Sequence, residues 1–276
     1  MKYKSLYIIF VSAFFGCSEL EQPNKNQFVV EGFITADFAI DDIKIKETVS
    51  INDSIQDIPI SDATITVSSS NSSVGLQYNP DTQKYYDLVG DFKIEVGENY
   101  EIEVSANSTV ATASTTVPEK PTGLTLTKSE LTIPQLRLNF DLREEIEELF
   151  RTEYSVLTWD SVPGQSYFVV IETQEAVLDP ILPEGVPEEA VELISSFRFI
   201  SEPSETTAFI IFGVALETYG RHVAKVYSIN QEYLDLFNAT AQDSRDLNEP
   251  PTNITNGLGI FSAFAVDSVE FNVVRE

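Results

Sequence analysis

The chain contains very little of the side-chain chemistry that most enzymes and metal sites depend on. Its 276 residues include one cysteine, one histidine, one tryptophan and one methionine. A single cysteine cannot form an internal disulfide, so the stability of the folded chain has to come from a packed core. Cysteine and histidine are also the usual zinc ligands, and one of each excludes an ordinary zinc site.

Basic residues are scarce as well. Lysine and arginine number 17 against 44 aspartates and glutamates, and the formal net charge at pH 7 is −27. A surface this acidic repels polyanions over long distances, so we expect no nucleic-acid partner. Cationic peptides, divalent ions and neutral glycans remain open as ligands, and the charge can also serve only to keep the surface soluble.

The apolar run near the N-terminus is too short to span a bilayer, which takes about 20 residues. It covers residues 6–15 and follows Lys2 and Lys4. A basic start, a short apolar run and a small residue before the processing point describe a secretory signal. We predict residues 1–16 to be a signal peptide that is removed, and residues 17–27 to be a flexible polar tether.

The single cysteine stands directly behind this run. Residues 14–17 (FFGC) resemble the bacterial lipobox, with Phe14 where leucine is usual. The resemblance implies that Cys17 carries lipid and anchors the chain to the outer membrane through two or more acyl chains. Residues 18–21 (SELE) are similar to the acidic signal that directs lipoproteins of the Bacteroidota to the cell surface. The alternatives are a free or buried Cys17 behind an ordinary signal peptide, and a tether that is acidic by chance.

Residues 28–117 are predicted to form an N-terminal β-sandwich. Runs of alternating apolar and polar residues are separated by the Asn, Asp, Gly and Pro residues typical of turns. The predicted strands cover residues 28–34, 43–51, 63–67, 92–96, 100–104 and 109–117. Residues 61–67 (SDATITV) resemble a transthyretin-like or carboxypeptidase-regulatory domain, which implies an Ig-like or transthyretin-like sandwich. Pro118, Pro121 and Gly123 then mark a domain boundary.

Residues 121–276 are predicted to form a second β-sandwich with helical insertions. The predicted strands cover 124–126, 136–140, 156–159, 167–172, 197–200, 208–212, 222–229 and 260–274, and the predicted helices cover 141–154, a segment starting near Pro187, and 231–238. Trp159, a turn at 162–164 and then Tyr167 resemble the B–C region of a fibronectin type III domain. The expected fold class is therefore mainly β, with two sandwiches.

No catalytic constellation stands out. His222 is the only histidine, lies at the start of an apolar strand and is expected to be structural, since no nucleophile-elbow motif accompanies it. Glutamates at 144, 145, 147 and 148 are expected to form the solvated face of a helix, although a glycosidase-type carboxylate pair stays open. Asp37, Asp41 and Asp42 could bind calcium but lack EF-hand spacing. We expect no enzyme activity, no metal and no cofactor.

The best candidate for a partner or ligand surface is the loop at 248–261. Its Pro, Asn and Gly residues allow backbone conformations that other residues avoid. The candidate residues within it are Asn253, Asn256, Gly257, Gly259 and Phe261. The alternative is a connection that packs over the sheet edge through Ile254, Leu258 and Ile260.

Three serines, Ser54, Ser161 and Ser268, follow an aspartate and precede an apolar residue. They resemble O-glycosylation sites of the Bacteroidota, although this motif also occurs by chance.

Two segments resemble a known family. Residues 29–32 (VVEG) and 253–261 (NITNGLGIF) are similar to a family of Bacteroidota outer-membrane lipoproteins that contain a domain of unknown function. Members are commonly encoded beside TonB-dependent transporters, which implies a non-catalytic accessory or binding subunit of such a transporter at the cell surface. A free-standing glycan- or peptide-binding adhesin and a carboxylate-dependent hydrolase are the alternatives.

Overall fold

The computed structural model of the chain describes residues 27–48, 58–136, 141–181, 198–240 and 251–276. The predicted signal peptide, nearly all of the tether, the end of the strand at 43–51, most of the strand at 136–140 and the helix near Pro187 lie outside these residues.

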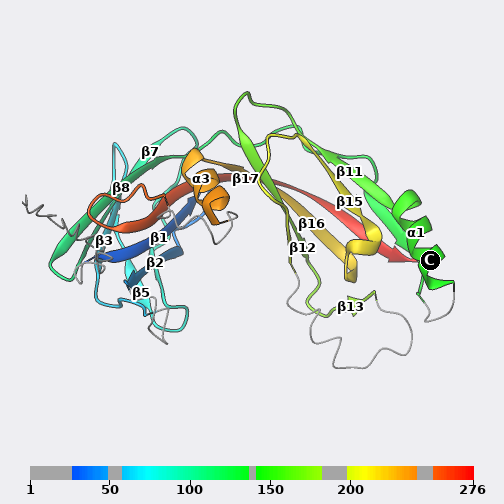
Figure 1. The fold of residues 1–276 in the computed structure, drawn as a ribbon, viewed down its shortest axis with the longest axis horizontal. Helices are drawn as coiled ribbons and strands as arrows, with labels where there is room; N and C mark the ends of the chain where they lie inside the picture. The colour runs from blue at the N-terminus through cyan, green and yellow to red at the C-terminus, as the bar shows by residue number, and fades with distance from the viewer. Residues whose placement is uncertain (1–26, 49–57, 137–140, 182–197, 241–250) are drawn as a thin grey trace, which may run out of the picture.

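The molecule is elongated, with two β-lobes joined by one long strand, β17 (Figure 1). The predicted mainly β fold with short helices in the second half is confirmed. The strands of the first lobe are β1 (Phe28–Thr35), β2 (Asp42–Glu47), β3 (Thr64–Ser68), β4 (Ser73–Gly75), β5 (Gln77–Asn79), β6 (Lys84–Tyr86), β7 (Asn99–Ala106) and β8 (Thr109–Thr116).

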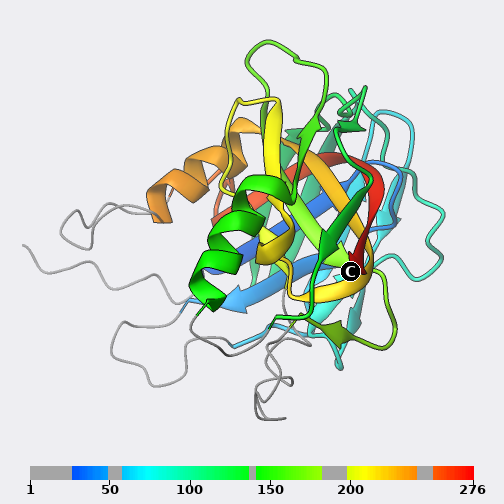
Figure 2. The same ribbon diagram turned by 90° about the vertical axis from the view of Figure 1, so that its right-hand side faces the viewer.

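The second lobe contains the remaining elements. They are β9 (Thr125–Leu126), β10 (Glu130–Ile133), α1 (Leu142–Thr152), β11 (Tyr154–Thr158), β12 (Ser166–Thr173), β13 (Asp179–Pro180), β14 (Phe199–Ile200), β15 (Ala208–Phe212), the 3-10 turn η1 (Gly213–Ala215), β16 (Thr218–Ile229), α3 (Gln231–Thr240) and β17 (Leu258–Arg275). The view along the long axis shows α1 and α3 on the same side of the molecule (Figure 2).

A ten-stranded sheet runs through both lobes in the order β14-β12-β16-β17-β1-β2-β6-β5, with β10 beside β17 and β13 beside β16. A four-stranded sheet, β4-β3-β7-β8, belongs to the first lobe, and a three-stranded sheet, β15-β11-β9, belongs to the second. Each smaller sheet encloses a core with the large sheet, because alternate side chains of a strand point to one face.

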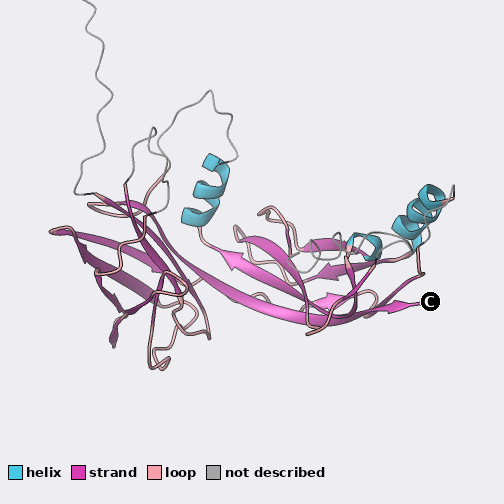
Figure 3. Ribbon diagram, turned by 90° about the horizontal axis from the view of Figure 1, so that it is seen from below, coloured by secondary structure: helices cyan, strands magenta, loops and turns pink. Residues whose placement is uncertain are grey.

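Strand β17 contributes to both cores and curves through both lobes (Figure 3). Its first part pairs in parallel with β1, and its later part pairs with β16 and β10. Phe261 and Ala263 lie in the first core, whereas Phe271 and Val273, on the same alternation, lie in the second.

The predicted boundary assigned all of residues 121–276 to the second sandwich, but the structure places Ile254 and the first part of β17 in the first core. The physical reason is that β1 has β2 on one edge only, and the start of β17 supplies the partner for its other edge.

The predicted strand at 92–96 is not a strand in the structure, although Phe92 and Ile94 are buried as the alternation predicts. The Tyr100 hydroxyl donates a hydrogen bond to Lys93 O (3.0 Å) and accepts one from Glu95 N (2.8 Å). A side chain therefore satisfies backbone groups of this segment that a neighbouring strand would otherwise satisfy.

The fibronectin-like segment has the expected local arrangement. Trp159 follows β11 and is buried, and its ring meets that of Tyr167 on β12 edge to face at 5.6 Å. The Tyr167 hydroxyl accepts a hydrogen bond from Val162 N in the turn between them (3.3 Å). This aromatic pair joins the three-stranded sheet to the large sheet.

Candidate ligand-binding groove

An aromatic row crosses four adjacent strands on the face of the large sheet that lies opposite the two cores. Phe33 is on β1, Phe264 on β17, Tyr227 on β16 and Phe168 on β12. Phe168 is directly opposite Tyr227 in the antiparallel register, and Thr35 pairs with Phe264 in the parallel register. The row exists because each of these residues alternates along its strand with residues that enter a core.

The rings of the row contact one another and a fifth ring from α3. Phe168 and Tyr227 stack at 4.8 Å with 7° between their planes, and Phe33 stacks on Phe264 at 5.6 Å and 16°. Tyr233 of α3 meets Phe264 edge to face at 5.1 Å. Aromatic pairs of these kinds add about 0.5–1.5 kcal/mol each beyond the area that they bury. The floor is therefore a rigid apolar surface.

Helix α3 is held next to this floor by its preceding residue. The Asn230 side-chain amide donates to Thr115 Oγ1 (2.7 Å) and to Thr116 O (2.8 Å) at the end of β8. These bonds attach the start of α3 to the first lobe. Burial raises the pKa of Tyr233, so its phenol stays protonated at neutral pH.

A groove of about 560 Å³ lies over the aromatic row. This volume lies within the range of ligand pockets, roughly 300–1,000 Å³. The groove is lined by the five rings together with Thr35, Phe38, Ala39, Asp41, Asp42, Arg198, Ile200 and Val266. Two of the lining side chains are large, apolar and more than half exposed, Phe38 at 57% and Ile200 at 55%. An apolar group of a ligand would be sheltered from water between the rings and these side chains.

The two sides of the groove differ in charge. On the β2 side, Asp42 pairs with Lys84 at 2.8 Å, and Asp41 is exposed and forms no ion pair with the described residues. On the β14 side, Arg198 pairs with Glu172 at 2.7 Å, and the same carboxylate also contacts Lys225.

Counting these groups, the β2 side keeps one uncompensated negative charge and the β14 side keeps one positive charge. The groove is thus an apolar floor between rims of opposite sign.

The loop proposed from the sequence packs against the first core. The Asn253 side chain donates to Phe261 O (2.7 Å) and accepts from Phe261 N (3.0 Å). Phe261 is fully buried in the first core and Ile254 is buried with it. Asn253 and Phe261 therefore connect the loop to the core, in agreement with the alternative of a packed connection.

The remaining residues of that loop serve close packing as well. Asn256 adopts a positive φ of 61°, and its amide donates to Val110 O at 3.4 Å. A Cβ on Gly257 would lie 3.2 Å from the Ala111 Cβ, and one on Gly259, whose φ is +100°, would lie 2.1 Å from Val30 O. These glycines allow the loop and β17 to approach β1 and β8.

His222 occupies a structural position in the second lobe. Its ring stacks on Phe271 at 5.4 Å, Nε2 lies 3.2 Å from Thr218 Oγ1, and Nδ1 lies 3.1 Å from Gly220 O. Burial lowers the pKa of His222, and the bond to Gly220 and the nearby Glu175 charge oppose this effect. The lowered pKa favours the neutral imidazole, and its ring contacts and hydrogen bonds are those of a side chain packed within the second lobe.

The carboxylates considered for calcium or hydrolysis are distributed over the surface. Asp37 lies 3.7 Å from Lys120, and Asp42 is paired as described above. Within the described ranges no group of three or more His, Cys, Asp or Glu residues could hold a metal ion. All four glutamates of α1 are exposed, and Glu147 pairs with Arg143 one turn earlier. They form a solvated helix face, as predicted.

Of the serines considered for glycosylation, Ser161 and Ser268 are exposed, and Ser54 lies outside the described residues. Cys17 also lies outside them. Exposure leaves Ser161 and Ser268 accessible to modification.

Sequence reasoning did not find the groove, although its residues gave a partial signal. Phe33, Phe168, Tyr227 and Phe264 are large aromatic residues at positions of their strands that point away from the cores. An amphipathic strand would normally present polar residues at such positions. An aromatic residue at such a position in each of the four strands indicates a second apolar face. Which of these residues become neighbours depends on how the strands pair, and that is seen only in the structure.

Comparisons with known proteins identify a family and show distant likeness to solved structures. No curated protein sequence matches the chain. A crystal structure of titin domains A168–A170 is 10% identical, with a TM-score of 0.22 over 89% of this chain and 62% of the titin fragment. A cytokine receptor complex is 8% identical, with a TM-score of 0.26 over 87% of this chain and 94% of that one. These TM-scores are too low to bear on topology or function.

No helix in the described part of the chain is both long and apolar enough to cross a membrane. The family described as a domain of unknown function, DUF4249, matches residues 18–270, and the chain therefore belongs to this family.

Proposed function

We propose that this chain is a non-catalytic, lipid-anchored binding protein of the outer membrane that serves as an accessory subunit of a TonB-dependent transporter. The observation that carries the proposal is the groove over the aromatic row, which is lined by side chains of β1, β12, β16, β17 and α3. The groove is lined by five aromatic rings together with Asp41, Asp42 and Arg198, which offer a ligand both apolar and charged contacts. Its chemistry is therefore suited to holding a ligand.

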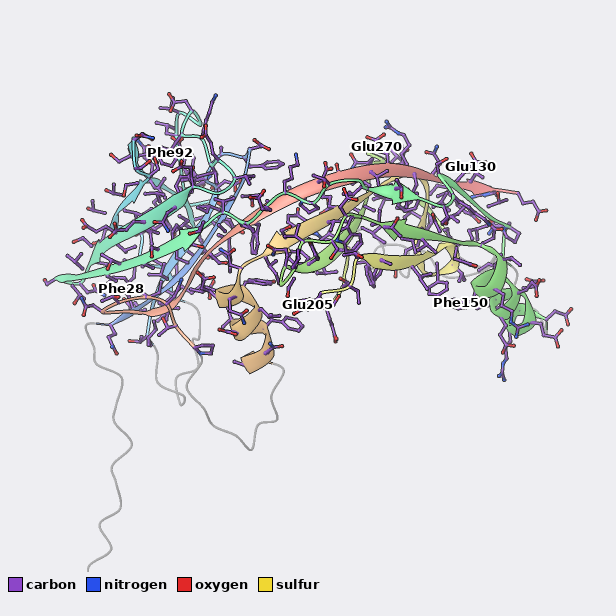
Figure 4. The ribbon with its side chains drawn as sticks, turned by 90° about the horizontal axis from the view of Figure 1, so that it is seen from above. Phe28, Phe92, Glu130, Phe150, Glu205 and Glu270 are labelled. Carbon is purple, nitrogen blue, oxygen red and sulfur yellow. The ribbon has the colours of Figure 1, made fainter. Side chains whose placement is uncertain are left out.

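The position of the N-terminal strand supports anchoring through Cys17. Phe28 lies at the end of the first lobe that is remote from the second lobe, and Phe150 lies near the opposite end (Figure 4). A tether over residues 17–27 could extend to roughly 35 Å, at about 3.3–3.6 Å per residue. In the proposed arrangement the first lobe is nearest the membrane and the second lobe projects away from it, with the groove between them.

The proposal is tested by comparing wild-type chain with Cys17→Ala in the native bacterium. Wild-type chain should remain in the outer-membrane fraction and carry lipid by mass spectrometry, and the variant should become soluble. After mild detergent extraction and crosslinking, wild-type chain should co-purify with a TonB-dependent transporter. Equal membrane retention of both forms would refute the anchor, and repeated recovery without a transporter would refute the partnership.

A free-standing peptide- or glycan-binding adhesin is the second candidate. The five aromatic rings of the groove favour it, because such rings can hold an apolar part of a peptide or glycan. The two candidates differ in one measurable respect. An adhesin would keep its full activity in a strain that lacks the transporter, whereas an accessory subunit would show no uptake phenotype beyond that of the transporter deletion.

A further inference from the structure

The groove combines features that together limit the chemistry of its ligand. Its floor is aromatic, and Phe38 and Ile200 at its edges are exposed apolar side chains. A ligand that fills it needs an apolar group to gain from this surface. A ligand without any apolar group would place its polar groups against the rings, Phe38 and Ile200, where they find no hydrogen-bond partner.

The rims add a requirement for charge. The β2 rim offers the carboxylate of Asp41, which forms no ion pair within the described part of the chain. The β14 rim offers Arg198, whose cluster with Glu172 and Lys225 has one excess positive charge. A dipolar ligand with an amino group at one end and a carboxylate at the other matches both rims. A ligand that is anionic throughout would also be repelled by the net charge of −27.

The separation of the rims limits the length of the ligand. In the strand order, β14 and β2 are five inter-strand steps apart. At about 4.8 Å per step the path along the sheet between the two backbones is roughly 24 Å, before the arginine and aspartate side chains reach inward. An extended peptide advances about 3.3–3.6 Å per residue, so one of about five residues spans the remaining distance.

We infer that the groove binds a short peptide with free termini, which crosses the strands with its amino group at Asp41 and its carboxylate at Arg198. A central apolar side chain lies on the aromatic row. This assignment deepens the proposed binding function and rests on it.

Isothermal titration calorimetry on full-length chain in zwitterionic lipid nanodiscs tests the assignment. The probe is Ala-Ser-Phe-Ser-Ala with free termini, compared with the same peptide acetylated at its N-terminus, the same peptide amidated at its C-terminus, and maltopentaose. The free peptide should bind, and blocking either terminus should weaken binding about threefold or more, as expected for one partly exposed ion pair. Maltopentaose should not bind.

Variants place each contact. Asp41→Asn should bind the acetylated and the free peptide with equal affinity, because the partner of the amino group is gone. Asp81→Asn, at an exposed turn away from the groove, is the control and should bind both peptides as wild type does. In Arg198→Gln the amidated and free peptides should bind equally. Phe38→Ser should weaken the free peptide about tenfold, and Val177→Ser, at an 86% exposed apolar residue outside the groove, should have no effect. Circular dichroism checks that each variant is folded.

Several results would overturn the assignment. Binding of maltopentaose without the peptide would make the groove a glycan site and would leave the proposed binding function intact. Equal binding of free and blocked peptides to wild type would remove the roles of Asp41 and Arg198. If neither probe binds while a transporter still co-purifies, the peptide assignment fails and the accessory role stands.

Discussion

Asn253 forms with Phe261 the same pair of hydrogen bonds that a neighbouring strand residue would form. Its amide nitrogen donates to Phe261 O at 2.7 Å, and its side-chain oxygen accepts from Phe261 N at 3.0 Å. This pairing covers the backbone of β17 where the strand enters the first core. One side chain thus replaces a short stretch of β-ladder.

Asn253→Asp should therefore destabilise the fold. The carboxylate can still accept from Phe261 N but faces Phe261 O without a proton to donate, and the buried carbonyl is left unsatisfied. The expected loss in the free energy of unfolding is about 1–3 kcal/mol, measured by chemical denaturation. Asn272→Asp, at an exposed site on the same strand, is the control and should change stability little. Similar losses in the two variants would contradict the role of the Asn253 bonds.

Gly259→Ala should prevent folding or destabilise it by more than about 4 kcal/mol. The residue has φ +100°, and a Cβ would lie 2.1 Å from Val30 O in the parallel pairing of β1 with β17. Gly97→Ala is the control that measures the cost of backbone strain alone. Gly97 also has a positive φ of 80°, but no atom lies within 4 Å of the added Cβ. This substitution should cost only about 1–2 kcal/mol. Thermal unfolding of both variants would measure the difference.

Tyr85→Phe should lower stability through two backbone groups in the first core. The Tyr85 hydroxyl donates to Ile60 O (2.7 Å) and accepts from Ala63 N (2.9 Å), and both partners are buried. Removing it leaves a buried donor and a buried acceptor unpaired, for an expected loss of about 2–3 kcal/mol. Tyr78→Phe is the matched control, because the Tyr78 hydroxyl makes no hydrogen bond within the described residues. Equal melting temperatures for the two variants would contradict the prediction.

The stability of the wild-type chain should fall between neutral and mildly acidic pH relative to His222→Gln. Burial lowers the pKa of His222 below the ordinary value of a histidine, about 6.5. As the pH falls below the pKa that His222 has in the unfolded chain, the unfolded chain binds a proton there and the folded chain does not. The free energy of unfolding therefore decreases until the pH reaches the lower pKa of the folded chain. Glutamine does not titrate, so the difference between the two proteins isolates this group from the many carboxylates. A difference that stays constant from pH 8 to pH 5 would argue against it.

Local patterns in the sequence predicted most of the elements. The alternation at 28–34, 109–117 and 260–274 corresponds to β1, β8 and β17, and the apolar spacing at 141–154 corresponds to α1. These predictions succeed because the side-chain periods of strands and helices are properties of consecutive residues. The same local rule overpredicted at 92–96, where burial alternates but the Tyr100 side chain takes the place of a strand partner.

Residues whose roles depend on distant partners could not be assigned in this way. The Asn and Gly residues at 253–259 have the composition of a mobile binding loop, but their function in the structure follows from contact with β1 and β8. Nothing in their local sequence distinguishes an Asn that caps a turn from one that bonds both backbone groups of Phe261.

The sequence by itself determined the kinds of element, the acidic charge and the scarcity of catalytic and metal-binding side chains, because these depend on composition and on neighbouring residues. Only the tertiary structure decided that β17 belongs to both cores, and that Phe33, Phe168, Tyr227 and Phe264 form one groove floor between rims of opposite charge. The reason is physical. Which residues of two distant strands lie side by side is set by the register of their pairing. A register shift of one residue would move each of these rings to the opposite face of the sheet, where the cores lie.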